Sequence, residues 1–210
     1  MNNYIHQYTS EKSINVFYEH DRFINEVLKN NEYGFYSLEG KQNLIVLDVG
    51  ANMGSFTWSI LPKIKHAYLI EPLQGCVDLI IKTIEANSLN NIEVFPIAMG
   101  NKCEMRGFCD IENSQTGSSG FLAGNHNTTV KVRDIETILN FIGIESVDLM
   151  KIDVECAEKE IFESESFSKV CSRIKAIIGE RHGDLEIKTA LEHNGYSYQE
   201  YGCHFTSERV

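Results

Sequence analysis

The chain has 210 residues, of which 42% are hydrophobic and 23% are charged, so it is long enough to bury one core of ordinary size. Its 19 basic and 30 acidic residues give a net charge of −11, which disfavours nucleic acid and anionic membranes as partners because both bind through lysine and arginine. No basic and apolar leader opens the sequence and no apolar run reaches the ~18 residues of a membrane span, so we expect a cytoplasmic protein.

The N-terminal part of the chain carries an apolar pattern with helical spacing. Within residues 13–30 the apolar side chains recur as one stripe, so we predict an N-terminal helical segment over residues 1–42. Short apolar runs then predict three strands of a sheet, at residues 43–49, 66–72 and 91–99. Residues 75–88, between the second and third runs, have the apolar spacing of a helix packed on a core. This order predicts parallel pairing of the strands.

The regular alternation stops at residues 101–132, which are polar, rich in turn-forming residues and without a helical period. We predict an insertion of short strands and loops above the sheet there, within a main domain that spans residues 43–210. Two interpretations of the insertion stay equally open: a solvated surface loop, or a lid on the substrate side of the domain.

Regular elements return after the insertion. A helix is predicted between an N-cap at Asp134 and a terminating glycine at Gly143. The remaining elements are strands at residues 147–154 and 174–182, a helix at 184–195 and an antiparallel hairpin at 196–210. The whole order predicts an α/β fold with a mostly parallel sheet, in which ligands bind at the carboxyl ends of the strands.

The stretch DVGANMG, Asp48–Gly54, joins the first predicted strand to a helix that we expect to begin near Ser55. A phosphate-binding loop requires a lysine after its last glycine, and Ser55 follows Gly54 here. A dinucleotide-binding turn requires GxGxxG, whereas Asn52 and Ser55 occupy the positions of its second and third glycines. The first interpretation fails and the second is weak.

S-adenosylmethionine fits this turn better, because it carries no phosphate. It requires room for an amino-acid group, backbone donors for a carboxylate and an acid near an ammonium group. Gly50 and Gly54 supply the room, the start of the helix supplies the donors, and Asp48 supplies the acid. A second acid, Glu71, closes the next strand about 20 residues later, where a carboxylate can accept from both ribose hydroxyls.

Several stretches of the chain resemble the FkbM-type methyltransferases, which use S-adenosylmethionine to methylate oxygen. They are VLDVGANMGSFT, IEP, AMGN and VDLMKIDVECAEKEIF, and the resemblance extends from about Tyr18 to Tyr201. It implies the class I methyltransferase fold, a Rossmann-like three-layer sandwich with a seven-stranded sheet and an antiparallel C-terminal hairpin. It also implies that the methyl acceptor is a hydroxyl of a small molecule or a sugar.

The resemblance carries the cofactor site onto particular residues of this chain. It implies that Ala98 and Met99, after the third strand, border the adenine. The predicted cofactor-binding residues are together Asp48, Gly50, Ala51, Asn52, Gly54, Glu71, Pro72, Ala98 and Met99. The chain departs from the family pattern DVEGAE at Cys156, which replaces the glycine. A glycine permits φ > 0 or the close approach of a ligand, so Cys156 narrows the site, marks a different substrate or has no effect.

Methyl transfer to a hydroxyl requires groups that position the acceptor and take its proton. Asp153 follows a buried run at the end of the fourth strand, which favours a raised pKa and a role as base. Glu180 and His182 alternate at the end of the fifth strand, so their side chains share one side. We predict that these three residues are catalytic. The competing interpretation is that Asp153 and Glu155 cap a helix that begins near Ala157.

The same two strand ends form a candidate site for Mg²⁺ or Mn²⁺, which would acidify a substrate hydroxyl. Its ligands would be Asp153, Glu155, Glu180 and His182. We favour the case without a metal. Two alternatives to a methyltransferase stay open: a nucleotide-dependent oxidoreductase on a Rossmann-like sheet, and a binding module that keeps the cofactor turn without catalysis. The sequence indicates no particular oligomeric state.

Overall fold

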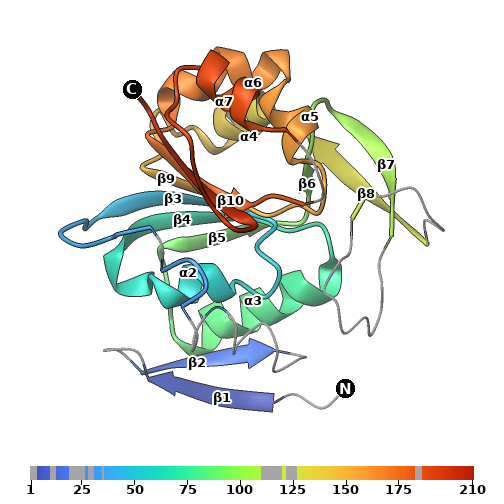
Figure 1. Ribbon diagram of the computed structural model, residues 1–210. Helices are drawn as coiled ribbons and strands as arrows, with labels where there is room; N and C mark the ends of the chain where they lie inside the picture. The colour runs from blue at the N-terminus through green and yellow to red at the C-terminus, as the bar shows by residue number, and fades with distance from the viewer. Residues whose placement is uncertain are drawn as a thin grey trace.

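The protein is described by a computed structural model over residues 4–9, 13–18, 27, 31–34, 36–109, 120–121, 127–182 and 186–210. Its central sheet lies between two layers of helices (Figure 1). One face carries α2 (Ser55–Ser59) and α3 (Gln74–Ala86). The other face carries α4 (Ile135–Ile142), α5 (Glu158–Phe162), α6 (Glu165–Val170) and α7 (Lys188–His193). Within the described ranges, no helix is both long and apolar enough to cross a membrane.

The central sheet has seven strands in the order β11-β12-β10-β9-β3-β4-β5. They are β3 (Leu44–Val49), β4 (Ile64–Ile70), β5 (Ile92–Phe95), β9 (Leu149–Ile152), β10 (Ala176–Glu180), β11 (Gln199–Tyr201) and β12 (His204–Glu208). Neighbouring strands are parallel except at β12, which runs antiparallel to both β10 and β11. The predicted α/β fold with an antiparallel C-terminal hairpin is confirmed.

The middle strands β3 and β9 are covered on both faces, which explains their nearly continuous apolar sequences. Along β3, Leu47 and Val49 pack with the α4–α7 layer, while Leu44 and Val46 pack with the α2–α3 layer. Because β3, β9 and β10 are parallel and adjacent, the residues that follow them meet at one edge of the sheet.

The ends of the helices follow from their cap residues. Asp134 caps α4 by accepting a hydrogen bond from Thr137 N at 2.9 Å, and Gly143 ends the helix with a φ of 74°. Gly54, with a φ of 78°, leads the chain into α2. Short 3-10 turns follow α2 and α6, at Leu61–Lys63 and Cys171–Arg173. The predicted boundaries of α4 are thereby confirmed.

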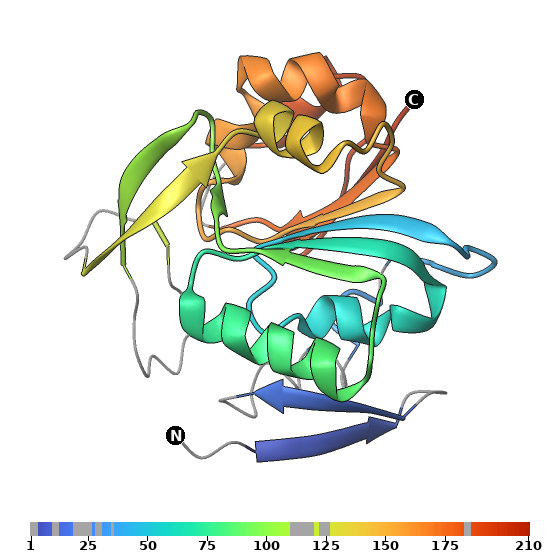
Figure 2. The same ribbon diagram turned by 180° about the vertical axis from the view of Figure 1, so that it is seen from behind.

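A hairpin stands where the N-terminal helix was predicted, with strands β1 (Tyr4–Thr9) and β2 (Ser13–Tyr18). The prediction is wrong over residues 13–18, where Ile14, Val16 and Tyr18 are buried in strict alternation. This period of two places their side chains on one face of the strand, and the hairpin packs beside α3 (Figure 2). The rest of the predicted helix lies outside the described residues, at 19–26 and 28–30. A division of the chain near residue 42 stays a prediction.

The third predicted strand is divided in two. β5 ends at Phe95, and after Pro96 the chain enters β6 (Ala98–Met99), which belongs to a second sheet. Because proline has no N–H for the ladder, the central sheet stops before it. The second sheet has the order β6-β8-β7, and its other strands are β7 (Glu104–Phe108) and β8 (Thr128–Arg133). Both come from the predicted insertion, of which residues 110–119 and 122–126 lie outside the described part.

Candidate active site

The chain turns sharply between β3 and α2, in the stretch predicted to hold a cofactor. Gly50, Asn52 and Gly54 have φ values of 71°, 51° and 78°, in the left-handed region that favours glycine. A Cβ at Gly50 would also lie only 1.8 Å from the carbonyl oxygen of Asp153. The turn is therefore packed directly against the chain that leaves β9.

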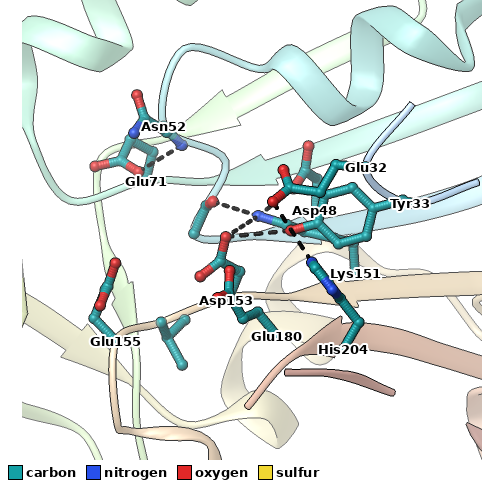
Figure 3. Close-up of polar contacts among 12 residues, drawn as sticks. Glu32, Tyr33, Asp48, Asn52, Glu71, Lys151, Asp153, Glu155, Glu180 and His204 are labelled. Atoms are coloured by element: carbon teal, nitrogen blue, oxygen red, sulfur yellow. Dashed lines mark hydrogen bonds and ion pairs between the residues drawn. The ribbon is translucent and has the colours of Figure 1, made fainter. Parts of the chain in front are cut away.

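Glu71, directly after β4, reaches across to the same turn. One of its carboxylate oxygens accepts a hydrogen bond from Asn52 N at 2.8 Å, and the other accepts from Leu73 N at 2.9 Å. Figure 3 shows Glu71 and Asn52 together on one side of the site. Burial raises the pKa of Glu71 to about 7, although the two backbone N–H groups and the Lys151 ammonium act in the opposite direction.

This side of the site fits an adenosyl cofactor. Each oxygen of Glu71 receives one backbone donor and keeps another lone pair, so the ionised carboxylate can accept from two hydroxyls. Ala51 lies in the turn with its N–H bonded to Ile70 O at 3.1 Å, and Pro72 is half-buried next to Glu71. Ala98 and Met99 are both buried in β6, and their contact with the adenine stays a prediction.

Asp48 lies beneath the turn and is fully buried. Its Oδ2 accepts a hydrogen bond from Thr57 Oγ1 at 2.6 Å, and its Oδ1 lies 3.7 Å from Lys151 Nζ. Burial raises the pKa of Asp48, while the Lys151 ammonium and the Thr57 hydroxyl partly offset this effect. Its contact with the ammonium group of a cofactor stays a prediction.

Asp153, directly after β9, is held on one side by two residues that are not among the predicted site residues. Its Oδ2 accepts a hydrogen bond from Tyr33 OH at 3.3 Å and lies 3.4 Å from Lys151 Nζ. The Lys151 ammonium also donates to Gly50 O at 2.7 Å. A lysine inside an apolar strand was a usable signal, because a buried charge requires a partner. Tyr33, far away in the sequence, carried no such signal.

His182 is surrounded by carboxylates. Its Nδ1 lies 2.9 Å from Oε1 of Glu158, a fully buried residue. Its Nε2 faces Glu155 Oε2 at 3.4 Å, Asp153 Oδ1 at 3.6 Å and Glu180 Oε2 at 4.0 Å. Burial opposes the charge on His182, but the hydrogen bond to Glu158 and the nearby carboxylates outweigh it and raise the pKa of His182 to about 9.

The structure thus brings the three predicted catalytic residues together at one edge of the sheet. His182 is charged at neutral pH, so among the three a carboxylate is the better proton acceptor. The alternative that Asp153 or Glu155 caps the next helix is wrong, because α5 follows Ala157 and has no side-chain cap. Glu158, the first residue of α5, instead joins the helix to the chain after β9, because its Oε1 accepts a hydrogen bond from Val154 N at 3.1 Å.

Glu32 and His204 form a second polar group beside Glu180. His204 Nε2 lies 3.5 Å from Glu32 Oε1, and Figure 3 shows this pair next to Tyr33 and Glu180. Donor atoms of Glu32, Glu180 and His204 all lie within 4.8 Å of one another, as do those of Asp153, Glu155 and His182. Either oxygen-rich group has the chemistry to bind Mg²⁺ or Mn²⁺.

The residues after β9 have an unusual backbone. Glu155 and Cys156 have φ values of 51° and 78°. A positive φ at Cys156 explains why a glycine is found at that position in the family pattern. Glu155 also packs against the insertion, since a Cβ at Gly120 would lie 2.9 Å from its Cβ. At Gly120 the insertion therefore contacts Glu155 at the edge of the site.

Comparisons with known proteins bear on the family and the fold of the chain. The family model of the methyltransferase FkbM domain matches residues 48–198. Among solved structures, the chain is similar to methyltransferase FkbM from Methylobacillus flagellatus KT, with a TM-score of 0.58 and 12% identity, over 89% of this chain and 47% of that chain. It therefore spans about half the length of that protein. A comparison with curated protein sequences gives no match.

Two smaller proteins are similar over most of their length. A proposed methyltransferase from Escherichia coli has a TM-score of 0.52 and 13% identity, over 95% of this chain and 93% of that chain. A proposed RNA methyltransferase from Pyrococcus horikoshii has a TM-score of 0.51 and 12% identity, over 90% of this chain and 85% of that chain. These likenesses show a shared fold, that of class I methyltransferases.

Proposed function

We propose, because the chain belongs to the FkbM family of S-adenosylmethionine-dependent methyltransferases, that it transfers a methyl group to a hydroxyl oxygen of a small molecule or a sugar. One observation carries this proposal: Asp153 lies where the cofactor turn meets the acidic end of the sheet. Its backbone contacts Gly50 of the turn, and its carboxylate Oδ1 faces His182. A base in this place adjoins both the turn expected to hold the cofactor and the polar residues that follow β9 and β10.

The chemistry divides between the cofactor and the chain. When bound, S-adenosylmethionine supplies a methyl group on a sulfonium, which requires no acid for its activation. The side chains must orient the acceptor hydroxyl and remove its proton. In our proposal Asp153 Oδ1 takes that proton, while Lys151 and His182 lie on the two sides of its carboxylate and hold its orientation. Glu180 and Glu155 orient the acceptor by accepting from its other hydroxyls.

The charges around the site disfavour a nucleic-acid acceptor. Five carboxylates gather there, those of Glu32, Asp153, Glu155, Glu158 and Glu180. A phosphate backbone is bound through basic side chains, and this end of the sheet offers an acidic surface within a chain of net charge −11. The likeness to an RNA methyltransferase concerns the fold and carries no weight for the acceptor.

A metal ion is not required by this arrangement. A divalent cation would act by lowering the pKa of the acceptor hydroxyl, and in our proposal the Asp153 carboxylate removes the proton without that help. Family membership sets aside the alternative of an oxidoreductase. The alternative of a binding module without catalysis is distinguished by measuring turnover.

The test is a turnover assay with methyl-labelled S-adenosylmethionine and a panel of hydroxyl-bearing small molecules and sugars, after treatment with EDTA. We expect labelled ether products, and we expect Asp153→Asn to lower kcat by about 100-fold or more. The exposed Asp78→Asn is the matched control and retains full activity. Transfer to RNA alone, a requirement for added Mg²⁺, or an Asp153→Asn enzyme within a few-fold of the unchanged protein would each contradict the proposal.

A further inference from the structure

Lys151 is a charged side chain buried in the middle of the sheet. It lies on β9, opposite Asp48 of β3 and Ile178 of β10, and only 5% of its side chain is exposed. Burial disfavours its charge, but the carboxylates of Asp153 and Asp48 outweigh this and raise the pKa of Lys151. A lysine in this position is costly to bury and is retained only where its contacts offset the loss of water.

The contacts of Lys151 belong to separate parts of the site. Its ammonium donates to Gly50 O at 2.7 Å, lies 3.4 Å from Asp153 Oδ2 and lies 3.7 Å from Asp48 Oδ1. The Gly50 carbonyl accepts a hydrogen bond from the ammonium, and the two carboxylates lie at ion-pair distance; among the described residues, Asp48 Oδ1 accepts no hydrogen bond. The Tyr33 ring lies over it, with 5.8 Å between Nζ and the ring centroid (Figure 3).

These contacts join the two halves of the site. Gly50 belongs to the turn predicted to hold the cofactor, and Asp153 is the proposed proton acceptor. Because Oδ2 of Asp153 is engaged by Lys151 and Tyr33, the other oxygen, Oδ1, is turned toward His182. We expect a shift of the cofactor turn to move the Lys151 ammonium and thereby to reorient the Asp153 carboxylate.

We propose that Lys151 is a positioning residue that couples the cofactor turn to Asp153, holding the Gly50 carbonyl on one side and the Asp153 carboxylate on the other. In this proposal it acts through Gly50 and Asp153 rather than by direct contact with the cofactor or the acceptor. The role of Asp153 as proton acceptor rests on the proposed function. The coupling itself is tested by measuring the binding of S-adenosylhomocysteine without any acceptor. A failure of the coupling is therefore distinguishable from a failure of the proposed function, which is tested by turnover.

The direct test observes the side-chain ammonium of Lys151 by NMR in protein labelled with ¹⁵N-lysine. The signal is assigned by its loss in Lys151→Arg. We expect it to shift when S-adenosylhomocysteine saturates the protein, and also in Asp153→Asn without ligand. The internal control is Lys175, whose side chain is 65% exposed and pairs with Asp148 before the start of β9. We expect its ammonium signal not to shift. A Lys151 signal unmoved by either change would overturn the coupling.

Calorimetry with S-adenosylhomocysteine gives an independent measurement. Lys151→Met removes the ammonium but keeps the length of the side chain, and we expect it to weaken binding by about tenfold or more. Lys175→Met should bind like the unchanged protein, and Lys151→Arg, which keeps a charged donor, should recover part of the loss. Unchanged affinity in a folded Lys151→Met protein would contradict the proposal. Should Lys151→Met fail to fold, Lys151→Arg and the NMR titration of the unchanged protein still decide the question.

Discussion

Glu155 and Cys156 follow one another with φ values of 51° and 78°, where side chains other than glycine are strained. The strain is located beside the proposed catalytic residues, because Glu155 lies 3.4 Å from His182. Cys156 itself is only partly buried. The backbone at Cys156 therefore has a conformation that suits glycine, although the residue carries a side chain.

Replacing Cys156 by glycine should stabilise the fold. Removing the strained left-handed residue gains ~1–2 kcal/mol, and the added freedom of the unfolded chain costs ~0.5–1 kcal/mol. We expect a net rise in the melting temperature of roughly 2–4 °C for Cys156→Gly. The control is Cys203→Gly, at an exposed cysteine without a positive φ, which should not stabilise the protein. Equal effects at both positions would argue against strain at Cys156.

We expect the ionisation of the Glu71 carboxyl group to make cofactor binding depend on pH. Burial raises its pKa from 4.5 to about 7, so its effect on the fold is most favourable below pH 4.5 and is lost as the pH rises through about 7. Cofactor binding has the opposite dependence, because the ribose hydroxyls donate to the ionised carboxylate. We expect the affinity for S-adenosylhomocysteine to rise by about fivefold or more between pH 6 and pH 8.

Calorimetry across this pH range checks the role of Glu71. In Glu71→Gln the affinity should be lower and should no longer rise with pH. Burial also raises the pKa of Glu155 to about 7, so Glu155→Gln is the matched control and should keep the pH dependence. A dependence that survives in Glu71→Gln and disappears in Glu155→Gln would place the titrating group on the acceptor side.

At the scale of elements, the site depends on how the β3 turn is packed against the end of β9. The two strands pair in register from Val46 and Leu149 to Val49 and Ile152, so Gly50 and Asp153 emerge side by side. Contact is possible because Gly50 has no Cβ. The same packing brings the cofactor turn within reach of the residues that follow β9 and β10.

Gly50→Ala and Gly143→Ala form a matched pair that separates contact from backbone strain. Both glycines have a similar positive φ, 71° and 74°, but a Cβ at Gly143 meets nothing within 4 Å. Gly143→Ala should therefore cost only the ~1–2 kcal/mol of the left-handed backbone and leave cofactor binding unchanged. Gly50→Ala should cost more and weaken binding of S-adenosylhomocysteine by about tenfold or more. Equal losses for both variants, measured by denaturation and calorimetry, would show that the contact with Asp153 is unimportant.

At the scale of the whole molecule, the helix layers cover the two faces of the central sheet, and the N-terminal hairpin lies on the outer side of α3. The N-terminal hairpin is joined to α3 by side-chain to backbone bonds, with Asn15 N donating to Asn87 Oδ1 at 2.9 Å and Phe17 N donating to Thr83 Oγ1 at 3.0 Å. Further along the chain, Tyr33 OH donates a hydrogen bond to Asp153 Oδ2. Described residues of the N-terminal part thus contact both α3 and the candidate site.

Ligand binding should therefore stabilise the molecule as a unit. S-adenosylhomocysteine at 100 times its dissociation constant should add ~2.7 kcal/mol to the free energy of unfolding. We expect a rise in melting temperature of roughly 5–10 °C in a thermal shift assay, and no rise with NAD. The reverse ranking of the two ligands would be incompatible with a cofactor site built for S-adenosylmethionine.

Some expectations from the sequence survived and others did not, for identifiable reasons. The helix at Ile135–Ile142 was predictable because its cap, apolar stripe and terminal glycine lie within ten residues of one another. The predicted N-terminal helix is wrong over residues 13–18, because Ile14, Val16 and Tyr18 alternate with the period of a strand inside a longer stretch of helical spacing. The convergence of Asp153, Glu180 and His182 was predictable because parallel strands end at one edge.

The sequence by itself determined the alternation of strands and helices in the central sheet, the parallel pairing and the position of the glycine turn after β3, because these depend on patterns among near neighbours. Only the tertiary structure decided the partners of the buried charges. Tyr33 and Asp153 are 120 residues apart, and Lys151 and Gly50 are 101 residues apart, so no local pattern joins either pair. Burial then shifts the pKa of each charged group according to its neighbours, and those neighbours are set by packing rather than by sequence distance.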